Sequence, residues 1–242
     1  METELLYLND SYMRESDALV TSVKDGKYVV LDKTIFYPNS GGQPHDEGFM
    51  TTKDGVSFKV IFVGKFSGNV SHEIEPIEGK AFSPDQEVHC TLDWGKRYKL
   101  MRSHTAAHVV SGIIAKELGA QIHGNQKSLE KIRIDFNTEN FDKEYLKELV
   151  EKSNRIIEQN LSVKTYFTGK DELEKNPDLM KLAKGLPEDV KEVRIVDIDG
   201  FDKQPCGGTH VNNLSEVGKL EFIKAENRGK NNRRLYFKLV ED

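Results

Sequence analysis

The hydrophobic pattern of this 242-residue chain changes its period near Trp94, and this change constrains the fold more than any other feature. Before Trp94, short apolar segments with polar alternation are separated by turn sequences, which is typical of β-strands. After Trp94, apolar residues recur first at a spacing of three and four, which is typical of an amphipathic helix. We therefore predict an α+β chain with two domains, residues 1–93 and 94–242.

The first domain is predicted to be a small antiparallel β-barrel or sandwich. Two Asp-Gly pairs, at residues 25–26 and 54–55, lie between alternating apolar segments, and this dipeptide is a strong hairpin signal. A glycine-rich loop at residues 37–44 contains two prolines, which exclude a helix there. We expect strands at residues 18–23, 28–31, 49–50, 56–62, 70–74 and 87–93.

The second domain is predicted to combine helices with an antiparallel sheet. Its pattern lacks a regular strand–helix–strand rhythm, a Walker loop and a GxGxxG sequence, so a nucleotide-binding sheet is excluded. Gly119 is a plausible end for the first helix. We expect helices at residues 96–118, 142–160 and 170–184, and strands at residues 132–136, 193–198, 220–223 and 235–239.

Composition and charge exclude several classes of protein. The net charge of −5, from 35 Lys and Arg against 40 Asp and Glu, argues against DNA as a partner but permits a local basic patch. Apolar runs are far shorter than the roughly 20 residues that span a bilayer, and the acidic start does not resemble a signal peptide. Two cysteines cannot form a disulfide scaffold. We expect a cytoplasmic protein with reduced thiols and no membrane partner.

Four residues point to a metal site. His104 and His108 are four apart in a predicted helix, which places both imidazoles on one face. About a hundred residues later, Cys206 and His210 flank two glycines and a threonine, which favour a tightly curved loop. Each pair alone is a weak signal, but together they supply the mixture of nitrogen and sulfur ligands that zinc prefers. We therefore predict that these four side chains bind one zinc ion.

These residues belong to a longer resemblance. The sequence resembles the AlaX-type alanyl-tRNA editing proteins, which are relatives of the editing domain of alanyl-tRNA synthetase. The likeness extends from about residue 30 to residue 238 and is carried by four stretches: residues 34–48, 101–108, 126–131, and 202–210 with 228–234 behind it. It implies a β-barrel like that of translation factors, followed by an α+β editing domain.

The resemblance also implies an activity. Proteins of this family hydrolyse the ester that joins a wrong amino acid to tRNA(Ala), chiefly serine, with glycine as a second candidate. The resemblance places the zinc ligands on the same four residues, and it matches Gln126 and Thr34 to positions that line or shape the amino-acid pocket. A local positive patch is expected to bind the tRNA phosphates. The candidate patches are Lys96, Arg97, Lys99 and Arg102, or Arg228, Lys230, Arg233 and Arg234.

Two other functions remain open at this point. A non-catalytic zinc module that binds tRNA or a synthetase would have four closed metal ligands and no cavity beside them. A zinc hydrolase with an unrelated small substrate is the third hypothesis, although the lack of a His-Glu-x-x-His sequence argues against a peptidase. Zinc would either activate a water molecule or orient the substrate, and both alternatives stay open.

Overall fold

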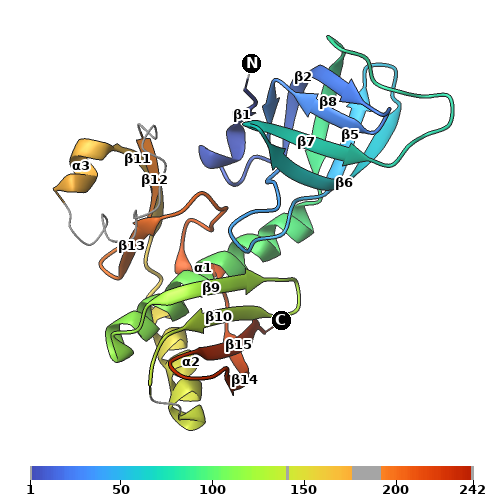
Figure 1. Ribbon diagram of the computed structural model, residues 1–242. Coiled ribbons are helices and arrows are strands. Elements are labelled where there is room, and N and C mark those ends of the chain that lie inside the picture. Colours follow the sequence, from blue (N-terminus) through green and yellow to red (C-terminus); the bar gives the residue numbers. More distant parts are fainter. Residues whose placement is uncertain (1, 140–141, 176–191, 241–242) are drawn as a thin grey trace. The chain divides into compact units, whose positions relative to one another are not determined.

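The computed structural model of the protein describes residues 2–139, 142–175 and 192–240 (Figure 1). Its contacts divide the chain into two compact units, Met1–Met101 and Arg102–Asp242. The division falls within helix α1 (Trp94–Leu118). None of the helices in the described part of the chain is long and apolar enough to span a bilayer.

The first unit is built around a closed antiparallel barrel. Six strands pair in the order β2-β3-β7-β6-β5-β8, which leaves no open sheet edge. Two short strands, β1 (Glu4–Leu5) and β4 (Lys33–Thr34), pair in parallel beside a 3-10 turn at Leu6–Leu8. The prediction of a small barrel is confirmed. The six barrel strands are β2 (Glu15–Lys24), β3 (Tyr28–Leu31), β5 (Gly48–Thr52), β6 (Ser57–Phe66), β7 (Asn69–Ile74) and β8 (Glu87–Leu92).

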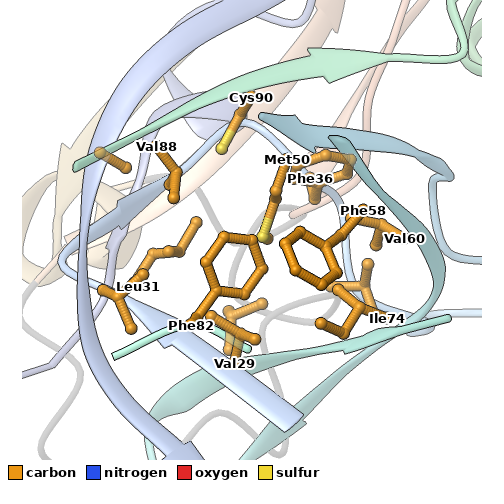
Figure 2. Close-up of a cluster of buried hydrophobic side chains, with 14 of the residues drawn as sticks. Val29, Leu31, Phe36, Met50, Phe58, Val60, Ile74, Phe82, Val88 and Cys90 are labelled. Atoms are coloured by element: carbon orange, nitrogen blue, oxygen red, sulfur yellow. The ribbon is translucent and has the colours of Figure 1, made fainter. Parts of the chain in front are cut away.

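Alternate residues of the barrel strands point inward, and their side chains fill the interior of the barrel. Figure 2 shows the apolar side chains that fill the interior, among them Met50, Phe58 and Phe82. The β2–β3 hairpin turns over residues 25–27, between the paired residues Lys24 and Tyr28, and Asp25 and Gly26 adopt positive φ angles of 53° and 66° there. Cys90 is fully buried in this core, and burial raises its thiol pKa to about 12.

A buried ion pair lies within the first unit, between the first turn of helix α1 and the loop before β5. Arg97 and Asp46 are both 0% exposed, and the arginine Nε lies 3.0 Å from each carboxylate oxygen. The Arg97 guanidinium also donates to the carbonyl oxygens of Ser11 and Ile35. The Asp46 carboxylate accepts from the backbone N–H of Tyr37 at 2.6 Å. Arg97 is therefore not available to a phosphate, contrary to its place in the first candidate patch.

The second unit contains two antiparallel sheets. One has the order β14-β15-β10-β9, and the other has the order β11-β12-β13. Helix α2 packs on the first sheet, where Asn154 exchanges hydrogen bonds with both backbone groups of Leu220. Asp142 caps this helix by accepting from two backbone N–H groups. The elements are β9 (Ile122–Lys127), β10 (Ile132–Phe136), α2 (Lys143–Ile157), β11 (Val163–Gly169), α3 (Lys170–Glu174), β12 (Glu192–Ile198), β13 (Asp202–Pro205), β14 (Leu220–Asn227) and β15 (Arg233–Leu239), with a 3-10 turn at Leu214–Glu216.

A bulge in β9 decides which of its side chains face the interior. Ile122 pairs with Phe136, but Gly124 pairs with Asp135, so His123 is an extra residue on this strand. Directly paired residues project to the same face of a sheet. Beyond the bulge, Lys127 therefore shares the face of buried Ile132, while the neighbouring Gln126 shares the opposite face with its partner on β10.

Most predicted elements of the second unit are confirmed. The strand at residues 132–136 and the first helix are present, and the helix begins at Trp94 because Asp93 accepts a hydrogen bond from the backbone N–H of Lys96. Gly119, with a φ of 60°, follows the end of that helix as expected. The third predicted helix starts at Lys170, while residues 176–184 of that prediction lie outside the described residues.

Candidate metal centre

Four side chains from two distant segments meet in the second unit. His104, His108, Cys206 and His210 each offer one ligand atom, and these atoms all lie within 4.8 Å of one another. The Cys206 Sγ is 3.5 Å from His104 Nε2 and 3.4 Å from His210 Nε2. We call these four residues the His–Cys cluster. All three imidazoles are at most 6% exposed.

Helix α1 supplies the first half of the cluster. His104 and His108 are one turn apart, and their ring centroids are 5.2 Å from each other. Thr105, between them in sequence, is fully buried and its Oγ1 lies 3.0 Å from Nδ1 of His210. The same hydroxyl oxygen accepts from the backbone N–H of Val211 at 3.3 Å. Thr105 thereby orients His210 so that its other ring nitrogen faces Cys206.

The loop after β13 supplies the second half. Arg194, on β12, donates from Nη1 to the carbonyl oxygens of Cys206 and Gly208 at 2.8 and 2.9 Å. The backbone N–H of Cys206 in turn donates to the Arg194 carbonyl at 3.0 Å. The backbone N–H of Gly208 points to the Cys206 sulfur at 3.4 Å. Arg194 and these backbone groups therefore hold the shape of the loop.

The turn between β12 and β13 places a carboxylate behind His108. Asp202 Oδ2 lies 3.6 Å from His108 Nδ1, so the other nitrogen of this imidazole faces the cluster. The turn approaches α1 closely because Gly112 has no side chain: a Cβ there would lie 2.9 Å from the Phe201 ring. Lys116 also donates to the Phe201 carbonyl at 2.5 Å. A carboxylate behind a ligating histidine is the usual way to fix its orientation.

Burial and mutual charge set the protonation states within the cluster. Burial lowers the pKa of His104 and His210 well below the ordinary range, so both imidazoles are neutral. Burial also opposes protonation of His108, but hydrogen bonds with Asp202 and Cys206 outweigh it and raise its pKa to about 9. For Cys206, burial disfavours the thiolate, yet the interaction with His108 brings its pKa below the ordinary value. The cluster thus combines two neutral imidazoles with a Cys206 sulfur inclined to ionise beside a protonated His108, whose proton a metal ion would displace on binding.

This donor set fits zinc. Zinc bonds of roughly 2.0–2.1 Å to nitrogen and about 2.3 Å to sulfur give a tetrahedron with nitrogen–sulfur edges of about 3.5 Å. The two sulfur–nitrogen distances of 3.4 and 3.5 Å match such an edge. Neutral imidazoles and a thiolate are the protonation states that metal binding requires. Buried nitrogen and sulfur ligands favour zinc over calcium or magnesium, which prefer oxygen ligands.

A cavity of about 80 Å³ lies beside the cluster. His104 and His108 form part of its wall, so one side of the cluster is accessible to a small ligand. Polar side chains from β9 and β13 also line it. The cavity is lined by His104, Ala107, His108, Ser111, Ile122, Asn125, Lys127 and Gln204.

Neither of the two predicted pocket residues is among the described residues that line this cavity. Gln126 is exposed on β9 and projects to the face opposite Lys127. Thr34 is fully buried in the first unit, where its hydroxyl lies 2.8 Å from His72 Nε2 and accepts from the backbone N–H of Phe36. The role of both residues in substrate binding stays a prediction.

The second predicted basic patch lies at and after the β14–β15 turn. Arg228 and Lys230 are exposed. Arg233 is 4% exposed, and its guanidinium donates to backbone carbonyls that include Gly229 and to the Asn227 side chain. Arg234 makes two hydrogen bonds to Asp135, at 2.6 and 3.1 Å. Two of the four cations are thus used inside the unit, and the tRNA role of the patch stays a prediction.

Four residues around the cluster were not singled out from the sequence: Thr105, Lys127, Arg194 and Asp202. Thr105 lies within the predicted helix and Asp202 within the Cys206 stretch, so proximity to the ligands was the only available signal. Lys127 is next to Gln126 in the 126–131 stretch, but nothing in the sequence of Lys127 or Arg194 shows their burial, because a buried lysine or arginine has the same sequence appearance as a solvated one.

Two family models and several known proteins are similar to this chain. A family model described as "Threonyl and Alanyl tRNA synthetase second additional domain" matches residues 193–236, and one described as "tRNA synthetases class II (A)" matches residues 3–96. An alanyl-tRNA editing protein AlaX-M of Methanosarcina acetivorans is 46% identical over 99% of this chain and 100% of its own length. The corresponding protein of Saccharolobus solfataricus is 39% identical over 97% of this chain and 98% of its own length.

A longer relative matches through part of its sequence only. An alanine–tRNA ligase of Staphylothermus marinus is 35% identical over 93% of this chain, which covers 24% of the ligase. The AlaX-M proteins, by contrast, are matched over nearly their whole length. The chain therefore belongs to the AlaX-M family of alanyl-tRNA editing proteins.

Proposed function

We propose that the protein hydrolyses mischarged tRNA(Ala) in trans, chiefly the seryl ester, with the glycyl ester as a second substrate. The observation that carries this proposal is the His–Cys cluster, which opens onto a small cavity in a chain of the AlaX-M family. The names of its full-length relatives state alanyl-tRNA editing. Hydrolysis of the ester returns a free amino acid and a tRNA with a free ribose hydroxyl.

The chemistry needs little activation, because an aminoacyl ester is already reactive. It requires a positioned water molecule, a polarised carbonyl group and a cavity that selects the acyl group. A zinc ion on the His–Cys cluster would supply Lewis acidity and favour ionisation of water near neutral pH. The protein would hold that ion through His104, His108, Cys206 and His210.

The surrounding residues keep the cluster ready for this chemistry. Thr105 and Asp202 hold the rings of His210 and His108, and Arg194 holds the loop that carries Cys206. Each contact fixes a side chain before substrate arrives, and such preorganisation is the main way in which an enzyme stabilises its transition state. These three residues position the ligands and do not contact the ester.

The size of the cavity supports a small acyl group. Its volume of about 80 Å³ is far below the roughly 300–1,000 Å³ of pockets for larger ligands. Size cannot separate serine from alanine, since serine is the larger, so a hydrogen bond to the seryl hydroxyl must favour serine. A site built to bond a hydroxyl rejects the analogue without it by leaving buried polar groups unpaired. We propose Thr34 and Gln126 as candidates for this hydrogen bond.

For the tRNA itself, we propose that the β14–β15 turn binds phosphate groups. Arg228 and Lys230 are exposed there, and the Arg233 side chain stabilises the turn by donating a hydrogen bond to the Gly229 carbonyl. Arg234 contributes positive charge next to them, although Asp135 neutralises part of it. Phosphate contacts of this kind give affinity that falls with salt.

The cavity also bears on the alternative of a non-catalytic zinc module. Such a module needs four closed ligands and has no use for an adjacent opening. Here two of the proposed ligands, His104 and His108, line an accessible cavity together with a buried lysine. This arrangement supports the hydrolase over the structural module.

The decisive experiment measures release of amino acid from purified Ser-tRNA(Ala), Gly-tRNA(Ala) and Ala-tRNA(Ala). We expect rapid release of serine, slower release of glycine and no measurable release of alanine. Thr34→Val and Gln126→Ala, with Thr34→Ser as the conservative control, test whether the Thr34 hydroxyl or the Gln126 amide forms the hydrogen bond to the seryl hydroxyl. A zinc-loaded wild-type protein that leaves Ser-tRNA(Ala) intact would contradict the proposed function.

A further inference from the structure

Lys127 is an unusual residue in this second unit because it is a lysine that is only 1% exposed. Lysine is almost never fully buried, since an ammonium group loses its hydration when it leaves water. Its Nζ donates to Asn125 Oδ1, a neutral acceptor, at 2.6 Å. A side chain buried at such a cost points to a role for the charge itself.

The location of Lys127 identifies what the charge faces. Pairing with buried Ile132 places Lys127 on the inner face of β9, and its side chain lines the cavity that His104 and His108 also line. The cavity is thus enclosed by the predicted metal ligands and by one buried ammonium group.

We infer that Lys127 is a catalytic residue that stabilises the negative charge developing on the carbonyl oxygen of the bound ester. This inference rests on the proposed hydrolase function. When the oxygen of water bonds to the acyl carbon, the π electrons of the carbonyl move to its oxygen. The Lys127 ammonium stabilises that charge. The carbonyl then re-forms, the ester C–O bond breaks, and the ribose oxygen leaves with a proton that originates from water.

The geometry favours this role over simple neutralisation of Cys206. A lysine that only balanced the thiolate would need no access to the cavity, whereas Lys127 forms part of its wall. Asn125, which lines the same cavity, accepts one hydrogen bond from the ammonium and so holds its direction. A fixed donor in a site shielded from water stabilises a developing charge far more than a mobile donor in solvent.

The experiment compares two inhibitors at the adenosine level with the zinc-loaded protein. One is the serine amide of 3′-amino-3′-deoxyadenosine, which is planar and neutral at the former ester. The other is its phosphonamidate analogue, which is tetrahedral and anionic there. In Lys127→Met we expect the phosphonamidate to lose about 10²–10³-fold in affinity while the amide loses little, and kcat on Ser-tRNA(Ala) to fall by a similar factor with KM nearly unchanged.

Two further variants and one measurement complete the test. Lys127→Arg keeps the charge and should retain more phosphonamidate affinity than Lys127→Met, even if the methionine variant folds poorly. Lys131→Met removes an exposed lysine of the same segment and should behave as wild type. Zinc content, measured by mass spectrometry, should stay at one ion per chain in all variants.

Three results would overturn the inference. An equal loss of affinity for both inhibitors in Lys127→Met would show that Lys127 is a general binding residue. Loss of bound zinc would show that it supports the metal centre. An unchanged kcat would show that it takes no part in catalysis. A wild-type protein that fails to release serine would contradict the proposed function instead, so the two failures are distinguishable.

Discussion

Both units of this protein bury histidine side chains, but they do so in opposite ways. In the barrel, His72 is fully buried, with Nδ1 3.0 Å from the Val29 carbonyl and Nε2 2.8 Å from the Thr34 hydroxyl. Because a carbonyl oxygen only accepts, Nδ1 carries the proton and Nε2 accepts from the hydroxyl. Each nitrogen of His72 thus has a protein partner, which makes it a structural residue.

In the second unit, three buried imidazoles face one another and a thiol. The ring centroids of His104 and His108 lie 4.3 and 4.5 Å from that of His210, and Cys206 Sγ is within 3.5 Å of two ring nitrogens. Such a group gains little from internal hydrogen bonds but matches the ligand set of a metal ion. The contrast teaches that burial alone does not separate structural from functional histidines, whereas the partners of the second nitrogen do.

The largest effect should follow from removing a residue of the His–Cys cluster. His210→Ala or Cys206→Ala leaves three ligands, and we expect loss of bound zinc and a fall of Ser-tRNA(Ala) hydrolysis to the spontaneous rate. The barrel is a separate compact unit, so the β signal in circular dichroism should persist. Metal analysis and a deacylation assay on the same preparation check this. A variant that loses zinc but keeps full activity would show that the His–Cys cluster is not catalytic. The contrast with the structural residue His72 would then fail.

The next effect concerns His72 and acid. Burial lowers the pKa of His72 to about 4, against 6.5 for an ordinary histidine, so the unfolded chain binds the proton more readily. Its contribution is fully present above pH 6.5 and is lost as the pH falls through 4, by about 3 kcal/mol in total. Urea unfolding at pH 7 and pH 4 measures this loss. His72→Gln, which does not titrate, should show a shallower dependence on pH, and an equal slope in both proteins would contradict the assignment.

A smaller effect is expected from the carboxylate behind His108. Asp202→Asn removes the charge 3.6 Å from His108 Nδ1 and should weaken zinc affinity about 10–100-fold. Competition with a chelator measures the affinity. Asp199→Asn, an exposed residue of the same turn, is the matched control and should bind zinc as wild type. If both variants behave alike, Asp202 does not orient the ligand.

The smallest effect should come from the exposed cations of the β14–β15 turn. Arg228→Ala and Lys230→Ala should each weaken tRNA binding less than about tenfold and reduce the slope of log affinity against log salt by roughly one. Filter binding between 50 and 200 mM salt would measure the slope. Lys147→Ala, on the exposed side of α2, is the control. An unchanged slope in both turn variants would place the tRNA elsewhere.

Regular patterns made much of the fold predictable from the sequence. The alternation at residues 132–136 and the Asp-Gly turn at residues 25–26 gave correct strands, because one face of each strand is apolar and buried. Strands β9 and β11 escaped prediction. The first has a single apolar residue, Ile122, followed by polar residues and a glycine, and the second is mostly exposed, so neither shows apolar alternation. These two strands form because each pairs with a neighbouring strand, although their own sequences lack a strand pattern.

The sequence predicted those residues of the candidate site whose side-chain type is suited to few roles. Histidine and cysteine at metal-ligand spacing mark zinc ligands, and the structure brings all four together. Charged residues carry no such restriction. Arg97 had the appearance of a surface cation, yet it is buried, because Asp46 lies beside it only in the folded chain. Lys127 is buried because its strand pairs it with Ile132, and this pairing also forms only in the folded chain. Long-range contacts of this kind leave no trace in local sequence.

The extra residue in β9 has a consequence for how this protein can change over evolutionary time. Because His123 bulges out of the pairing, Ile122 shares one face with Asn125 and Lys127. Deleting His123 would leave the pairs on either side of it unchanged and restore regular alternation, with Lys127 still on the cavity side. A length change of one amino acid at this point would therefore alter the backbone of the strand and preserve the charged wall of the cavity.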